Sequence, residues 1–235
     1  MTTLENRIQQ VEDRIKKAAQ AGGRKREDVL LLAVTKTWGA DVVRKAYDAG
    51  LRNFGENYVQ EALEKIENLK NEIPEAKWHF IGHLQSNKVK NLIGKFEMIH
   101  SVDRISLAEE ISKRVDQNPD VNEPQKILIE VNIANEESKN GISFEALPEF
   151  LDEIQAFQHI MVRGLMIMPP ISESKTEVKR LFNQIRDEKD RLSTRLSSPH
   201  SLIELSMGTS HDYVEAIEAG ATIVRLGTTL FGERE

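Results

Sequence analysis

The chain of 235 residues contains no cysteine. Disulfide bonds, thiolate nucleophiles and cysteine-ligated zinc or iron–sulfur centres are therefore excluded. No apolar run approaches the roughly 18 residues that a membrane-spanning helix needs. The N-terminal stretch MTTLENRIQQVEDRIKKAAQ carries acidic side chains, unlike a secretion signal or a transit peptide. We therefore expect a cytoplasmic protein with no membrane segment.

Positive charge is also in deficit, because 32 Lys and Arg stand against 38 Asp and Glu, which gives a formal net charge of −6. This acidic balance argues against nucleic-acid binding, although a local basic pocket can still hold a small anion. No Pro/Gly/Ser-rich linker and no repeat divides the chain. We expect a single domain over residues 1–235, long enough to bury a substantial core.

Short apolar, β-branched runs alternate along the chain with longer amphipathic patterns. The first amphipathic pattern covers about residues 2–21, and Gly22-Gly23 ends it. Eight strands with intervening helices fit a closed (β/α)8 barrel or an open doubly wound sheet, and the count of eight favours the barrel. The runs VLLLAVT and KILIEVNI are almost wholly apolar, as parallel strands covered on both faces require. The predicted strands are 29–35, 52–54, 78–81, 98–102, 126–133, 161–166, 203–205 and 222–226.

The active site of such a barrel lies where the carboxyl ends of the strands lead into loops. Lys36 directly follows the first buried strand. Partial desolvation there would lower the pKa of the amine and allow a Schiff base with a carbonyl. The alternative is a surface lysine that begins a loop. Asn57 follows the second strand, where it either faces the barrel mouth or caps a helix.

Two other patterns suggest chemistry that the sequence does not support. His79 and His83 are four residues apart, but they lie on a strand entering a loop, and no third ligand is near, so we predict no metal site. The run SMGTSHD after the seventh strand lacks the second glycine of a nucleophile elbow. Its hydroxyl and N–H groups instead suit a turn that caps a helix or binds an anion.

The run RLGTTLFG follows the eighth strand. Gly227 and Gly232 have the spacing of a Walker A loop, but the required Lys-Ser/Thr is missing, so a nucleoside triphosphate loop is rejected. A Gly-Thr-Thr turn still offers donors to a phosphate, and barrels commonly bind phosphate after strands seven and eight. Arg225, near the end of that strand, either directs its charge to the centre of the site or pairs with a carboxylate.

These strand-end residues suit one ligand together. A lysine after the first strand could face a phosphate-binding turn after the last strands, with an arginine between them. This combination fits pyridoxal 5′-phosphate (PLP), a flat aldehyde that carries a phosphate. The lysine would form the imine, the turn would hold the phosphate, and Arg225 would approach the pyridine nitrogen.

The chain resembles the YggS/PROSC-type pyridoxal-phosphate homeostasis proteins in the stretches LLAVTKT, NFGENYVQE, WHFIGHLQSNK, GLMIM, LSMGTSHD and VRLGTTLFG, which run over nearly its whole length. The resemblance implies an alanine-racemase-type barrel (fold type III of PLP proteins) in which the lysine holds PLP as a Schiff base. It also implies phosphate contacts from three residues, an arginine at the ring nitrogen and an asparagine near the ring. These residues are Lys36 for the imine; Ser206, Gly227 and Thr228 for the phosphate; and Arg225 and Asn57 for the ring.

Three positions depart from the family pattern. Thr35 stands where serine is usual, Ile167 where threonine is common, and Thr209 where methionine is usual. They leave the cofactor assignment unchanged and bear only on side-chain contacts near the ring.

The same residues bear on activity. PLP stabilises a carbanion best when its ring nitrogen is protonated, and an arginine opposes that proton. Racemisation needs acid–base groups on both faces of the substrate carbon, and we expect no counterpart of the β-domain that accompanies the barrel in alanine racemases. We expect a monomer that takes part in intracellular PLP homeostasis and delivers PLP to PLP-dependent apoenzymes, with no assigned catalytic residue. The alternatives are a low-activity PLP-dependent amino-acid racemase and an aldolase that uses Lys36 without a cofactor.

Overall fold

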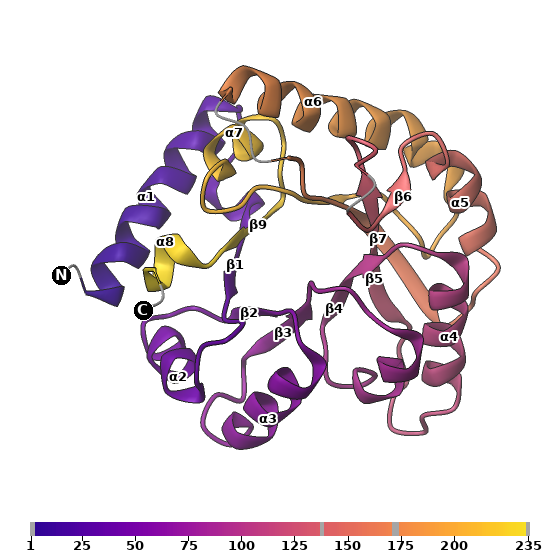
Figure 1. The fold of residues 1–235 in the computed structure, drawn as a ribbon, viewed down its shortest axis with the longest axis horizontal. Helices are drawn as coiled ribbons and strands as arrows, with labels where there is room; N and C mark the ends of the chain where they lie inside the picture. The colour runs from indigo at the N-terminus through magenta and orange to yellow at the C-terminus, as the bar shows by residue number, and fades with distance from the viewer. Residues whose placement is uncertain (1–2, 137–138, 171–173, 234–235) are drawn as a thin grey trace.

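A computed structural model describes residues 3–136, 139–170 and 174–233. Eight parallel strands close into a barrel, because β4 pairs with both β3 and β5, and β1 pairs with β2 and β9 (Figure 1). All eight predicted strands are confirmed to within a few residues. They are β1 (Leu30–Val34), β2 (Asn53–Glu56), β3 (Lys77–Phe80), β4 (Met98–Val102), β5 (Gln125–Asn132), β7 (Ile160–Ile167), β8 (Glu204–Ser206) and β9 (Ile223–Leu226).

Helices surround the barrel in the order of the chain (Figure 1). Their amphipathic faces cover the outside of the strands, as the sequence pattern predicts. The helices are α1 (Leu4–Ala21), α2 (Ala40–Asp48), α3 (Val59–Leu69), α4 (Ile105–Asp116), α5 (Leu147–Ile154), α6 (Lys175–Leu192) and α7 (Tyr213–Glu218), with a 3₁₀ helix at Ser86–Asn91 between β3 and β4.

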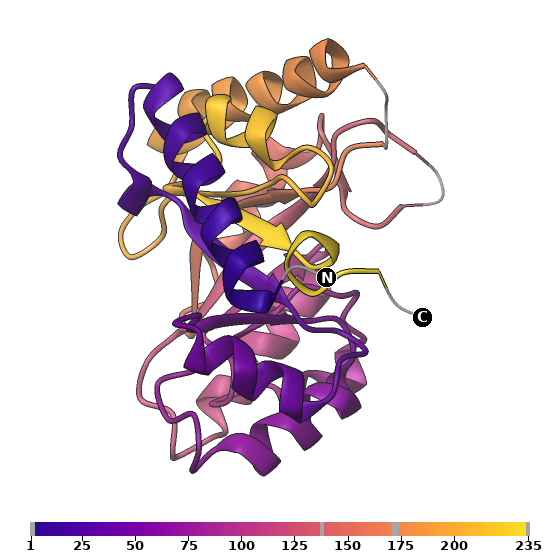
Figure 2. The ribbon, with the colours of Figure 1, turned by 90° about the vertical axis from the view of Figure 1, so that its left-hand side faces the viewer.

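The predicted extra helix at the N-terminus is α1. Thr3 caps it by accepting a hydrogen bond from the N–H of Asn6 at 3.3 Å, so the helix begins at Leu4. Thr2, which the prediction included, lies outside the described residues. Helix α1 packs against α7 and against α8 (Thr228–Phe231), on the outside of the barrel where β1 pairs with β9 (Figures 1 and 2).

Two short elements are not predicted by the sequence. Strand β6 (Ile142–Ser143) pairs with β5 beside the barrel, and α8 (Thr228–Phe231) forms one turn directly after β9. Both are too short for a periodic pattern to show. Helix α8 matters for the site because it places the Gly-Thr-Thr turn at the carboxyl end of β9.

The apolar core has two layers. A large layer fills the space between strands and helices. A smaller one lies inside the barrel and consists of Leu32, Met98, Leu128, Met166 and Ile223. Because this interior is apolar, polar groups inside it must be hydrogen-bonded to one another. In the described part of the chain, no helix is long and apolar enough to cross a membrane.

Candidate functional site

A cavity of about 280 Å³ opens at the carboxyl ends of the barrel strands. This size is just below the range of about 300–1,000 Å³ that is usual for small-molecule pockets. Five of the six predicted site residues line it, namely Lys36, Asn57, Arg225, Gly227 and Thr228. The described residues include no group of three or more His, Asp or Glu side chains that could hold a metal ion.

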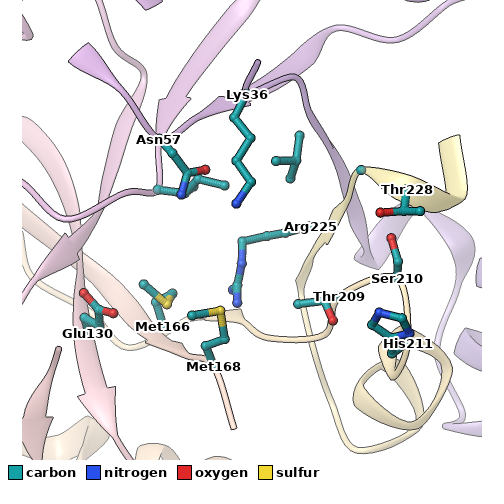
Figure 3. A pocket seen from close by; sticks show the side chains of 13 residues that line it. Lys36, Asn57, Glu130, Met166, Met168, Thr209, Ser210, His211, Arg225 and Thr228 are labelled. Atoms are coloured by element: carbon teal, nitrogen blue, oxygen red, sulfur yellow. The ribbon is translucent and has the colours of Figure 1, made fainter. Parts of the chain in front are cut away.

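Lys36 directly follows β1, and its ammonium points into the cavity (Figure 3). Behind it lies a buried group of charged and polar side chains. Lys65 Nζ donates to Glu56 Oε1 at 2.8 Å and to the carbonyl of Thr35 at 2.6 Å, and the Thr35 hydroxyl donates to the same Glu56 oxygen at 2.6 Å. Burial raises the pKa of Glu56, and the bonds from Lys65 and Thr35 oppose that rise. This group fixes the backbone immediately before Lys36.

The residue after Lys36 is fixed as well. Thr37 has a φ of 64°, in the left-handed region that is rare for a β-branched residue. Its N–H donates to the carboxylate of Glu61, which in turn accepts from Lys65 Nζ at 2.6 Å. The conformations on both sides of Lys36 are therefore tied to the same buried lysine.

Asn57 reaches the cavity because its backbone packs tightly on Gly82. A Cβ built on Gly82 would lie 2.2 Å from the Asn57 carbonyl oxygen, so only glycine fits there. The Asn57 side-chain oxygen is buried and has no hydrogen-bond partner among the described residues. Since an unpaired buried polar atom is costly, this oxygen suits a polar group of a ligand in the cavity.

Arg225 lies at the base of the cavity and is only 6% exposed. Its guanidinium donates to the Ser206 carbonyl at 2.7 Å, to the Ser206 hydroxyl at 2.8 Å and to the Ile167 carbonyl at 2.9 Å. These partners are neutral, so direct pairing with a carboxylate is not what holds it. Burial lowers the pKa of Arg225 to about 10, and the side chain remains a cation at neutral pH.

Ser206 lies apart from the cavity that the other five predicted site residues line. Its side chain is fully buried and turned into the barrel interior beneath Arg225, and it is not part of the cavity lining. Ser210, in the loop after β8, lines the cavity instead and accepts a hydrogen bond from the N–H of Thr229 at 3.2 Å. Both serines lie in the run SMGTSHD. Ser206 is the last residue of β8, whereas Ser210 lies in the loop that follows and lines the cavity.

Glu130 is a cavity residue that sequence reasoning missed, because it lies within the apolar run of β5. Its carboxyl group lies on the same side of the cavity as Met166, away from Thr228 and Ser210 (Figure 3). Burial and, to a smaller extent, the charge of Asp103 raise its pKa, Arg225 opposes the rise, and together they bring the pKa to about 7. The cavity therefore contains a carboxyl group that titrates near neutral pH.

This carboxyl group makes folding stability pH-dependent. Because burial raises the folded-state pKa of Glu130 above its ordinary value, its contribution to stability is present in acid and is lost as the pH rises through about 7. We expect Glu130→Gln to increase the free energy of unfolding by about 1–3 kcal/mol at alkaline pH and to change it little in acid. Urea unfolding across this pH range measures the difference. The control is Glu109→Gln, which changes an exposed glutamate. If the free energy of unfolding of Glu130→Gln depended on pH as that of the wild type does, the raised pKa of Glu130 would be contradicted.

The closed parallel barrel, with a lysine after β1 and an arginine on β9, defines a class of PLP-barrel protein, and the comparisons agree. Residues 7–235 match the family of the alanine racemase N-terminal domain, and the chain belongs to this family. It resembles the alanine racemase of Clostridium difficile 630 in fold, with a TM-score of 0.70 at 16% identity over 94% of this chain and 55% of that one.

Its curated relatives within the family are pyridoxal phosphate homeostasis proteins. The one from Aquifex aeolicus is 46% identical and covers 97% of both chains. The structure of PipY from Synechococcus elongatus PCC7942 with PLP bound is 35% identical, with a TM-score of 0.80 over 93% of this chain and 100% of that one.

Proposed function

We propose that this protein binds PLP as a Schiff base on Lys36 and takes part in PLP homeostasis. The observation that carries the proposal is the meeting of Lys36, Arg225 and the Ser210–Thr228 side of the cavity around one space (Figure 3). Its relatives are named as PLP homeostasis proteins, and PipY has been solved with PLP bound. Location in the cytoplasm, a monomeric state and delivery of PLP to PLP-dependent apoenzymes belong to the same proposal.

Each part of the cavity has a role in this proposal. The hydroxyls of Ser210 and Thr228 and the N–H groups at Gly227 and Thr228 hold the phosphate, because the first N–H groups of a helix have no partners within it. Asn57 supplies its unpaired oxygen beside the ring. When bound, PLP supplies an aldehyde that condenses with the Lys36 amine, forming a C=N bond and releasing water.

The racemase alternative is not favoured. Arg225 presents only N–H donors and a positive charge to the cavity, which opposes protonation of a ring nitrogen. None of the chain's three tyrosines, Tyr47, Tyr58 and Tyr213, lines the cavity to serve as a second acid–base group. A role in binding fits this set of side chains better than carbanion chemistry.

Comparison of PLP with pyridoxal, which lacks the phosphate, tests the proposal. Several hydrogen bonds to a charged phosphate, each contributing about 1.5–3 kcal/mol, predict at least about 100-fold tighter binding of PLP. Titration followed by imine absorbance measures both affinities. Equal affinities for PLP and pyridoxal would contradict the phosphate-binding role of Ser210 and Thr228. A protein that develops no imine absorbance with PLP would refute the proposed function.

A further inference from the structure

A line of hydrogen-bonded polar side chains crosses the barrel interior from the amino ends of the strands to the cavity. Asn53 Oδ1 lies 3.3 Å from His79 Nε2, and His79 Nδ1 lies 3.0 Å from His100 Nε2. His100 Nδ1 lies 3.0 Å from Ser206 Oγ, which accepts from Arg225. We call these five residues the histidine line. Their surroundings in the barrel are apolar, so the line is not explained by packing alone.

The two ends of the histidine line fix the position of every hydrogen along it. The oxygen of Asn53 can only accept, so His79 carries its proton on Nε2. A neutral His79 then accepts at Nδ1 from His100 Nε2–H, which leaves His100 Nδ1 as an acceptor. The Ser206 hydroxyl must therefore donate to His100, and its oxygen only accepts from Arg225.

Burial, more than the surrounding charges, keeps both imidazoles neutral. His79 is 2% exposed, and its pKa is lowered to about 4, mainly by burial, with Glu97 opposing the change and Lys77 and Lys126 adding to it. His100 is fully buried, and its pKa is lowered well below the ordinary value by burial, by His79 and by Arg225. Neither ring gains a second proton near neutral pH, so the direction of the line does not change there.

We propose that His79 and His100 are positioning residues for Arg225. Their fixed tautomers hold the Ser206 hydroxyl hydrogen away from the guanidinium, so that Ser206 Oγ and the carbonyls of Ser206 and Ile167 take three of its five N–H groups. The guanidinium is thereby held at one place at the base of the cavity. The last step, in which Arg225 contacts the ring of PLP, rests on the proposed function.

The tautomers can be tested without any ligand. Imidazole nitrogen NMR of histidine-labelled protein distinguishes Nδ1–H, Nε2–H and doubly protonated rings, and single His79→Phe and His100→Phe variants assign the signals. We expect both rings as Nε2–H tautomers that do not titrate between about pH 5.5 and 8.5. An Nδ1–H tautomer at either ring, or titration of either ring in this range, would overturn the proposal.

Two substitutions of His100 test whether the histidine line affects PLP binding in the cavity. Glutamine can accept from Ser206 through Oε1 and donate to His79 through Nε2, whereas phenylalanine can do neither. We expect PLP affinity about tenfold weaker for His100→Phe and within about threefold of wild type for His100→Gln. The half-buried ring of His159 lies outside the histidine line, so His159→Gln is the control and should bind PLP as the wild type does.

Each result bears on the proposal. Wild-type affinity in His100→Phe, or equal losses in the Phe and Gln variants, would overturn it. Where His100→Phe does not fold, Ser206→Ala ends the line with a smaller change and is expected to weaken PLP about tenfold. A wild-type protein that binds no PLP would instead refute the proposed function, and the tautomer measurement would still stand.

Discussion

Lys36→Ala is expected to remove the imine absorbance of the PLP-loaded protein completely, because no other side chain brings an amine into the described cavity. The phosphate-binding side of the cavity is unchanged by this substitution, so non-covalent binding remains. We expect the affinity to fall on the order of 100-fold, equivalent to about 2.7 kcal/mol. Absorbance titration measures how much PLP is bound as the imine, and equilibrium dialysis measures the total PLP bound.

The matched control is Lys88→Ala, which removes an exposed lysine elsewhere on the surface and should leave both readings at wild-type values. Retention of the imine band by Lys36→Ala would show that another amine captures PLP. Loss of folding is excluded by comparing the thermal transitions of the two variants.

Lys65→Met is expected to destabilise the whole fold. Lys65 and Glu56 are both buried, at 5% and 0% exposure, and the substitution would leave the Glu56 carboxylate without its cation. Breaking a buried ion pair by removing one partner costs about 3–5 kcal/mol. Because the same ammonium holds the carbonyl of Thr35 and the carboxylate of Glu61, the variant should also hold Lys36 less firmly and bind PLP more weakly.

Two controls separate charge from shape in the Lys65 experiment. Lys70→Met removes an exposed lysine from the end of the same helix and should change the free energy of unfolding by less than about 0.5 kcal/mol. The double variant Glu56→Gln with Lys65→Met removes both buried charges and should recover a large part of the loss. Urea unfolding measures the free energy of unfolding of the two single variants and the double variant. A Lys65→Met protein as stable as wild type would contradict the role assigned to the Lys65–Glu56 pair.

Most of the fold can be predicted from the sequence because a parallel barrel repeats a strong local signal. Strands such as β1 and β5 are buried on both faces, so their apolar runs are unmistakable, and the helices carry clear amphipathic patterns. The two-residue strand β6 and the single turn α8 carry no such signal. Their existence depends on packing against the finished barrel.

The site is predicted less completely for a different reason. Lys36, Arg225 and the Gly227–Thr228 turn follow from the rule that function gathers at the carboxyl ends of barrel strands. Whether Ser206 or Ser210 reaches the cavity depends on which way each side chain faces at the end of β8. Glu130, His79 and His100 lie in strands that otherwise read as apolar, and only the closed barrel shows what they contact.

Borohydride reduction of the PLP-loaded wild-type protein, followed by peptide mass mapping, identifies the lysine that forms the imine. Reduction converts an imine to a stable secondary amine, so the lysine that captured PLP keeps the label through digestion. We expect one labelled lysine, Lys36. A label on a different lysine, or no label after reduction of a PLP-saturated sample, would contradict it.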